Sequence, residues 1–213
     1  MAIRVRPPDV KGGNYARLLS LEYGFEVENR AVPASMVSDV DLGQLESVES
    51  YDAFILHFGI VEASNRSVGR ALYQYLNRPS EEISTIERPL VLVLLKLESM
   101  FRSRLVRLRG SRGWIDDDTF SRKYRKLVSA LSAHAPVICV GINTPSQRVE
   151  DQLPGSSNKV SRFNQAIRDA SESTKQYFVD STDLIRSEDM PDGIHFNVSG
   201  HQKLARAINS LLV

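Results

Sequence analysis

Short aliphatic runs that alternate with longer helical patterns constrain the fold of this chain most. Apolar runs occupy 53–59, 137–142 and 176–180, and the last two each follow a segment with helical spacing of apolar residues. Parallel strands need long connections between them, which are usually helices. This alternation therefore predicts an α/β protein with a parallel sheet. We predict a further strand over 25–31.

Apolar residues at helical spacing predict the remaining elements, which cover 15–23, 90–109, 120–133, 160–171 and 197–212. Gly24 is a typical helix stop, and Ser199 with Gln202 forms a capping-box pattern for the closing helix. The segment 90–109 begins with a strand-like run, LVLVLL. We predict one helix there because no turn residue interrupts it and Pro89 suits a first helical turn.

Length and charge limit the function classes. A chain of 213 residues fits one α/β domain, which we predict over 1–213. With 27 Lys and Arg against 26 Asp and Glu, the net charge is +1, so no global field attracts nucleic acid or a membrane, and any polyanion site must be local. We expect neither as a partner. No glycine-rich phosphate loop is present, which argues against nucleotide chemistry.

The only cysteine is Cys139, so an internal disulfide and a cysteine metal cluster are excluded. Its aliphatic neighbours predict a buried thiol rather than a nucleophile. We expect no metal and no organic cofactor.

The first residues contain no apolar run typical of a secretory signal, so we predict a cytoplasmic protein. The sequence leaves the oligomeric state of the protein open.

The segment DGIHFNVSGH at 192–201 carries the strongest chemical signal. An Asp three residues before a His allows the carboxylate of Asp192 to bind one imidazole nitrogen of His195 while the other nitrogen faces a substrate. That is the orienter and base pair of a hydrolytic triad. The same spacing also occurs in helix caps and surface hydrogen bonds, so both interpretations stay open.

Together with two other segments, this one resembles the SGNH or GDSL-type hydrolases, a family of esterases, lipases and carbohydrate deacetylases. NRAVPASMVSDV resembles the family's second block, AFILHFGIVEASNR its third block, and DGIHFNVSGH its C-terminal block. The resemblance implies a three-layer α/β/α sandwich with a flavodoxin-like parallel sheet. It also implies His195 as general base and Asp192 as its orienter.

The second and third blocks depart from the family pattern. Ala34 stands where the family has an oxyanion-hole glycine, although a backbone N–H can still donate from alanine. The common Gly-x-Asn-Asp is replaced by GIVE at 59–62, and losing such an amide donor costs roughly 2.7 to 4 kcal/mol. The GIVE form of the third block resembles that of a divergent branch of the family associated with bacterial surface-polysaccharide genes. Arg66 then either binds the anion in place of the asparagine or is a solvated loop residue.

The first block departs furthest. The family's nucleophilic serine lies in a Gly-Asp-Ser motif at the end of the first strand, and this sequence contains no such motif and no serine before Ser20. A start codon placed too late and a real loss of the first strand both explain this, and both remain open. Under either explanation, the sequence predicts no ordinary serine-hydrolase activity for these 213 residues.

Three functional hypotheses follow. The first is an ester hydrolase or acyl-transfer enzyme for an acyl ester or acylated saccharide, with oxyanion donors near Ala34 and Gly59 and a serine outside this sequence. The second is a catalytically dead relative that binds a carbohydrate or acyl ligand. The third is an unrelated flavodoxin-like small-molecule binder.

Other polar residues have simpler interpretations. His57 lies in an apolar strand and is expected to be a hydrogen-bonded core residue, His201 to be structural, and His134 to lie on the surface. The basic residues between Arg102 and Lys126 are interrupted by three aspartates at 116–118. This pattern favours a solvated helix face over an anion site.

Overall fold

A three-stranded parallel sheet lies at the centre of the computed structural model, which describes residues 13–32, 35–41, 43, 51–78 and 82–213. Its strands are β1 (Phe54–Leu56), β2 (Val137–Val140) and β3 (Tyr177–Val179), in that spatial order. Leu56 pairs with Cys139, and Cys139 pairs with Phe178. All three predicted central strands are therefore confirmed, each shorter than its apolar run.

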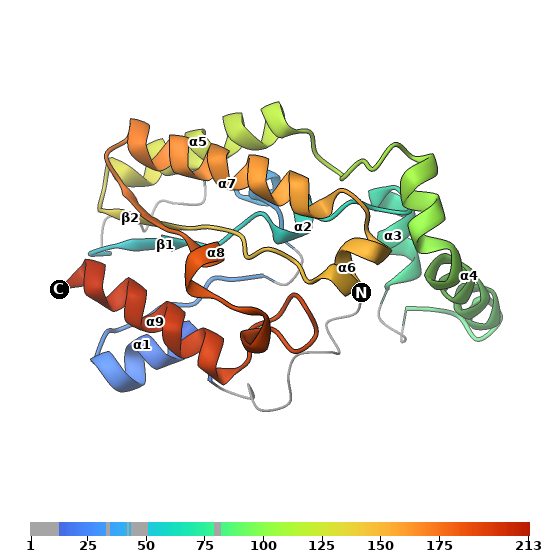
Figure 1. The fold of residues 1–213 in the computed structure, drawn as a ribbon, viewed down its shortest axis with the longest axis horizontal. Coiled ribbons are helices and arrows are strands. Elements are labelled where there is room, and N and C mark those ends of the chain that lie inside the picture. Colours follow the sequence, from blue (N-terminus) through green and yellow to red (C-terminus); the bar gives the residue numbers. More distant parts are fainter. Residues whose placement is uncertain (1–12, 33–34, 42, 44–50, 79–81) are drawn as a thin grey trace.

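Helices cover both faces of the sheet (Figure 1). α5 (Asp117–Ser132) and α7 (Ser156–Ser173) lie on one face, and α1 (Tyr15–Tyr23) and α9 (Val198–Leu212) lie on the other. This arrangement confirms the predicted three-layer α/β/α sandwich. The prediction that the chain lacks the family's first strand concerns residues before α1, of which 1–12 lie outside the described part.

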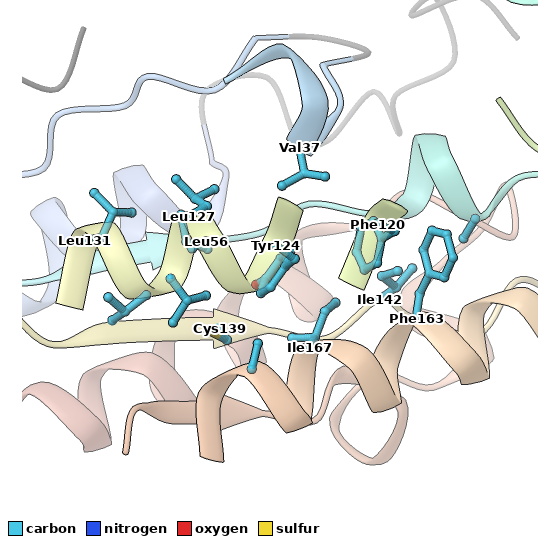
Figure 2. Close-up of a cluster of buried hydrophobic side chains, with 14 of the residues drawn as sticks. Val37, Leu56, Phe120, Tyr124, Leu127, Leu131, Cys139, Ile142, Phe163 and Ile167 are labelled. Atoms are coloured by element: carbon cyan, nitrogen blue, oxygen red, sulfur yellow. The ribbon is translucent and has the colours of Figure 1, made fainter. Parts of the chain in front are cut away.

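The core between the sheet and the α5–α7 layer contains the largest buried side chains (Figure 2). Phe120 of α5 stacks on Phe163 of α7, with ring centroids 3.9 Å apart. Tyr124 is fully buried beside them, and its neighbour Cys139 is also buried. Every residue of β2 is buried, because helices cover this central strand from both sides. Its unbroken apolar sequence follows from that position.

α1 and α9 enclose a second core on the opposite face, which contains Leu19, Ile138 and Leu204. α1 begins after Asn14, whose side chain accepts a hydrogen bond from the Arg17 N–H, and ends at Gly24. Gly24 has a φ of +76°, a left-handed conformation that favours glycine. The predicted stop is therefore confirmed.

The described residues also form the helices α2 (Ile60–Ala63), α3 (Arg70–Leu76), α4 (Glu87–Leu108), α6 (Gln147–Gln152) and α8 (Ser181–Leu184). The single helix predicted over 90–109 is confirmed as α4, with Pro89 in its first turn. Figure 1 places α4 at one end of the molecule, next to α3 and away from the strands.

Two local predictions are wrong. The segment 25–31 forms no strand, although Phe25 and Val27 pack against the α1–α9 core. Its alternating pattern gives it a buried side, but a strand also needs a partner backbone, and none of the described residues supplies one. The N-cap of α9 is Asn197 rather than Ser199, because the Asn197 Oδ1 accepts from the Gly200 N–H at 2.9 Å.

Candidate active site

His195 and Asp192 form a hydrogen-bonded pair in the loop before α9. The His195 Nδ1 lies 2.6 Å from the Asp192 Oδ2. The Asp192 Oδ1 accepts from the backbone N–H of Ile194 at 3.0 Å and from that of His195 at 2.7 Å. Only 9% of the Asp192 side chain is exposed, against 42% for His195. A buried carboxylate therefore orients an imidazole whose far side is open to solvent.

The hydrogen bonds also set the charge of Asp192. Burial favours the neutral acid and pushes its pKa upward. The hydrogen bonds from the His195 side chain and from the two backbone N–H groups outweigh burial, so the pKa lies below its usual value. Asp192 is thus a carboxylate at neutral pH, as an orienter of a proton-accepting histidine must be.

The sharp turn of this loop depends on Gly193, whose φ is +83°. A Cβ at this position would lie 2.8 Å from the Ser146 Cβ and would also overlap the Ser146 Oγ. The Gly193 carbonyl accepts from the Ser146 N–H at 3.0 Å. The loop therefore approaches the start of α6 so closely that only glycine fits.

Two side chains that the sequence analysis did not identify hold the same loop. Asn143 Nδ2 donates to the Ile194 carbonyl at 3.1 Å, and Arg148 Nη2 donates to the Asp192 carbonyl at 2.5 Å. Both belong to the segment after β2. The sequence carried no signal for these particular contacts.

The loop also packs on the carboxyl end of β1. Phe196 stacks on His57, with ring centroids 6.0 Å apart, and His57 directly follows the strand. His195 therefore lies beside the carboxyl ends of β1 and β2, where open parallel sheets bind their ligands.

Gly59 connects β1 to α2 with a φ of +115°. A Cβ here would approach Ile142 Cγ1 to 2.9 Å, so the position excludes larger residues. Ile142 itself is fixed by Asn164, whose Oδ1 accepts from the Ile142 N–H at 2.7 Å and whose Nδ2 donates to its carbonyl at 2.8 Å. These contacts give the carboxyl edge a rigid backbone.

Glu62, in the third block, anchors the second block. Its Oε1 accepts from the Val37 N–H at 2.6 Å, and its side chain is fully buried. Burial raises the pKa of Glu62 in spite of this hydrogen bond. Ala34, the predicted oxyanion residue of the second block, lies outside the described residues. Glu62 was visible in the sequence as the acid of the third block, but its role was not.

Arg66 lies within the protein, with its guanidinium over the ring of Trp114 at 4.3 Å and over that of Tyr73 at 5.4 Å. Its Nη2 donates to the Val61 carbonyl at 3.0 Å. Its Nε is buried and has no hydrogen-bond partner among the described residues. The interpretation of Arg66 as a solvated loop residue is therefore wrong.

The structure also places the other three histidines and the single cysteine of the chain. His134 is exposed, as expected. Burial, followed by the charge of His201, lowers the pKa of His57 to about 4, so His57 is neutral. His201 Nδ1 accepts from the Tyr15 N–H at 3.3 Å, which agrees with a structural role. Burial raises the pKa of Cys139 to about 11, as a core thiol requires.

In the part of the chain that the structure describes, no group of three or more His, Cys, Asp or Glu side chains is arranged to hold a metal ion. The described helices include none with the length and apolar composition needed to cross a membrane.

The parallel α/β/α sandwich with a His–Asp pair at its carboxyl edge agrees with the SGNH hydrolase fold. The chain belongs to the GDSL-like lipase/acylhydrolase family, whose model matches residues 7–203. Among curated proteins, no sequence matches the chain.

Several solved structures share this fold. The acetylxylan esterase Axe2 from Geobacillus stearothermophilus has 18% identity and a TM-score of 0.57, over 93% of this chain and 80% of that chain. LAE5, an alpha/beta hydrolase from the metagenome of Lake Arreo, Spain, has 14% identity and a TM-score of 0.60, over 94% and 82%. The aryl esterase of M. smegmatis has 15% identity and a TM-score of 0.57, over 93% and 86%.

Proposed function

We propose that this chain is a single domain that carries the general-base half of an ester-hydrolase site, with His195 as base and Asp192 as its orienter. The observation that carries the proposal is the 2.6 Å contact between His195 Nδ1 and Asp192 Oδ2, together with the exposed far side of the imidazole. This contact assigns the proton to Nδ1, so Nε2 has a free lone pair for a hydroxyl proton.

In the complete reaction, a serine Oγ attacks the acyl carbonyl while His195 Nε2 takes its proton. The same proton then passes to the leaving alcohol as the ester C–O bond breaks, and water releases the acyl group by the same steps. Backbone N–H groups near Ala34 and Gly59 stabilise the oxyanion. The sequence has no Gly-Asp-Ser motif to supply this serine. We therefore propose that the 213-residue chain alone forms no acyl-enzyme.

The substrate class that we propose is an acylated saccharide. Two observations support this class: a structural neighbour is an acetylxylan esterase, and the third block of this chain has the divergent form. We propose that Arg66 helps to bind this substrate. Its Nη2 donates to the carbonyl of Val61, the residue that stands where the family has an asparagine, and its buried Nε has no hydrogen-bond partner among the described residues.

Fluorophosphonate labelling followed by peptide mapping tests the catalytic proposal, on this chain and on a version extended upstream in the same reading frame. We expect only the extended chain to label, at a new serine, and we expect His195→Gln and Asp192→Asn to reduce labelling strongly. His134→Gln is the matched control, because this histidine is exposed and distant in sequence. Full labelling in His195→Gln would refute the assignment of the base.

A catalytically dead binding protein is the second candidate, and the absent serine motif together with Val61 favours it. It predicts saturable binding of an acetylated xylo-oligosaccharide without turnover in both versions of the chain. Calorimetric titration measures this binding, which His195→Gln should leave unchanged.

A further inference from the structure

Most apolar side chains of α4 point away from the protein. The exposed ones are Leu90, Leu92, Val93, Leu94, Leu97, Met100, Phe101 and Leu108. Met100 is 66% exposed and Leu108 84%. Apolar surface so concentrated on one helix is unusual for a monomeric protein and marks an interaction surface.

Five of these eight residues lie in a continuous stripe along the helix, and Leu92, Val93 and Met100 lie outside it. Positions 90, 94, 97, 101, 104 and 108 are separated by alternating steps of four and three, so they share one face. The only polar member of this row is Arg104. Val91 and Val106, which are buried, lie outside this row and attach α4 to the rest of the protein. We call the six-residue row the α4 stripe.

The unpaired charges on the exposed side of α4 have one sign. Arg88, Lys96, Arg104 and Arg107 are exposed, and all four are cations. The two carboxylates of the helix are already paired: Glu98 with Arg102 at 2.7 Å, and Glu87 with Arg78 at 3.8 Å. The exposed side of α4 therefore combines apolar side chains with unopposed positive charge.

We propose that α4 binds the surface of an anionic lipid bilayer and lies in the plane of the interface. Leu94, Leu97 and Phe101 would enter the boundary between headgroups and acyl chains, while Lys96, Arg104 and Arg107 remain at the level of the lipid phosphates. Helices with an apolar face and flanking cations bind membranes in this way. The long side chains of Lys and Arg reach the phosphates while their carbon chains stay on the apolar face.

A second copy of the chain fits the α4 stripe less well. In a parallel pair, Arg104 would face its own symmetry mate within the apolar seam. An antiparallel pair would place Arg104 against Leu94, and the two carboxylates of α4, Glu87 and Glu98, are already paired with Arg78 and Arg102. An anionic bilayer satisfies both the apolar side chains and the cations, so the charge pattern favours lipid over self-association.

This proposal departs from the expectation of no membrane partner, which rested on the net charge of +1. Net charge averages over the whole surface, whereas an interfacial helix responds to its own charges within a Debye length of about 8 Å at physiological salt. The proposal does not depend on the His195 site.

Vesicle co-sedimentation of the full 213-residue chain tests the inference. We expect binding to phosphatidylcholine vesicles with 30% phosphatidylserine, little binding to pure phosphatidylcholine, and weakening with salt. Arg104→Gln and Arg107→Gln should each weaken binding about 5-fold, the usual effect of one basic residue near an anionic surface. The double variant Leu94→Glu/Phe101→Glu should bind no better than wild type binds pure phosphatidylcholine.

Matched controls lie elsewhere on the surface. Leu21→Glu on α1 changes an equally apolar residue that is 68% exposed, and Arg206→Gln on α9 removes an exposed cation. Both should leave vesicle binding unchanged, and circular dichroism confirms that each variant folds. Equal binding by wild type and by Leu94→Glu/Phe101→Glu would refute the proposal.

Light scattering after size exclusion separates lipid binding from self-association. A monomeric wild type that binds anionic vesicles supports the proposal. A dimer that becomes monomeric in Leu94→Glu/Phe101→Glu, without vesicle binding by the wild type, would overturn it in favour of a second copy.

Discussion

Replacing Gly59 by alanine should destabilise the protein through two separable effects. The residue has a φ of +115°, which L-residues with a side chain rarely adopt. Its added Cβ would also overlap Ile142, approaching Cγ1 to 2.9 Å. Gly24 offers a matched control because it has a φ of +76° and nothing lies within 4 Å of a Cβ built there.

The magnitudes follow from these contacts. A left-handed conformation costs a residue with a Cβ about 1 to 2 kcal/mol, and forcing an extra methyl into a packed site costs about 1 to 3 kcal/mol. Gly24→Ala should therefore lower the free energy of unfolding by about 1 to 2 kcal/mol, and Gly59→Ala by about 2 to 5 kcal/mol. The difference measures the overlap with Ile142.

Urea denaturation followed by circular dichroism measures both values. Ile142→Ala removes the overlapping atoms, so the double variant Gly59→Ala/Ile142→Ala should be more stable than the sum of the single effects predicts, by about 1 to 3 kcal/mol. Equal destabilisation by Gly59→Ala and Gly24→Ala, or strict additivity in the double variant, would refute the close approach at the carboxyl edge of β1.

Three further changes test other parts of the structure. The pKa of His57 is lowered to about 4 in the folded protein, so the unfolded state binds more protons below pH 6.5. The free energy of unfolding should therefore fall by about 2 kcal/mol between pH 7 and 4.5. Urea titrations at the two pH values should show a smaller fall in His57→Gln. Asn164→Ala leaves the backbone N–H and carbonyl of Ile142 without their partner and should lower the unfolding free energy by about 2 to 4 kcal/mol. Thermal denaturation measures this loss, and an unchanged stability would contradict the role of the amide. With a pKa of about 11, Cys139 should resist iodoacetamide at pH 8 in the native protein and react after unfolding; rapid native labelling, followed by mass spectrometry, would contradict its burial.

The elements that the sequence predicted correctly are those with strong local signals. α4 was predicted because no turn residue interrupts it, and β2 because a strand buried on both faces is apolar throughout. The strand over 25–31 was wrong because strand formation needs a second backbone, which a local pattern cannot reveal. The α9 cap was misplaced by two residues because both Asn197 and Ser199 are good capping residues.

The candidate site divides in the same way. The pair of Asp192 and His195 was predictable because only three residues separate its members. The contacts of Asn143 and Arg148 with the same loop span 51 and 44 residues, so they depend on how the sheet brings two loops together. Neither residue type nor spacing indicates such contacts in a single sequence.

The sequence by itself determined the alternation of strands and helices, the family resemblance and the local His–Asp pair, since each depends on neighbouring residues. The tertiary structure alone decided that Arg66 is stacked on Trp114, and that Glu62 ties the second block to the third. It also decided that the apolar residues of α4 face outward. Periodicity shows which side chains share a face of a helix, but only the packing of distant segments determines whether the protein covers that face or leaves it exposed.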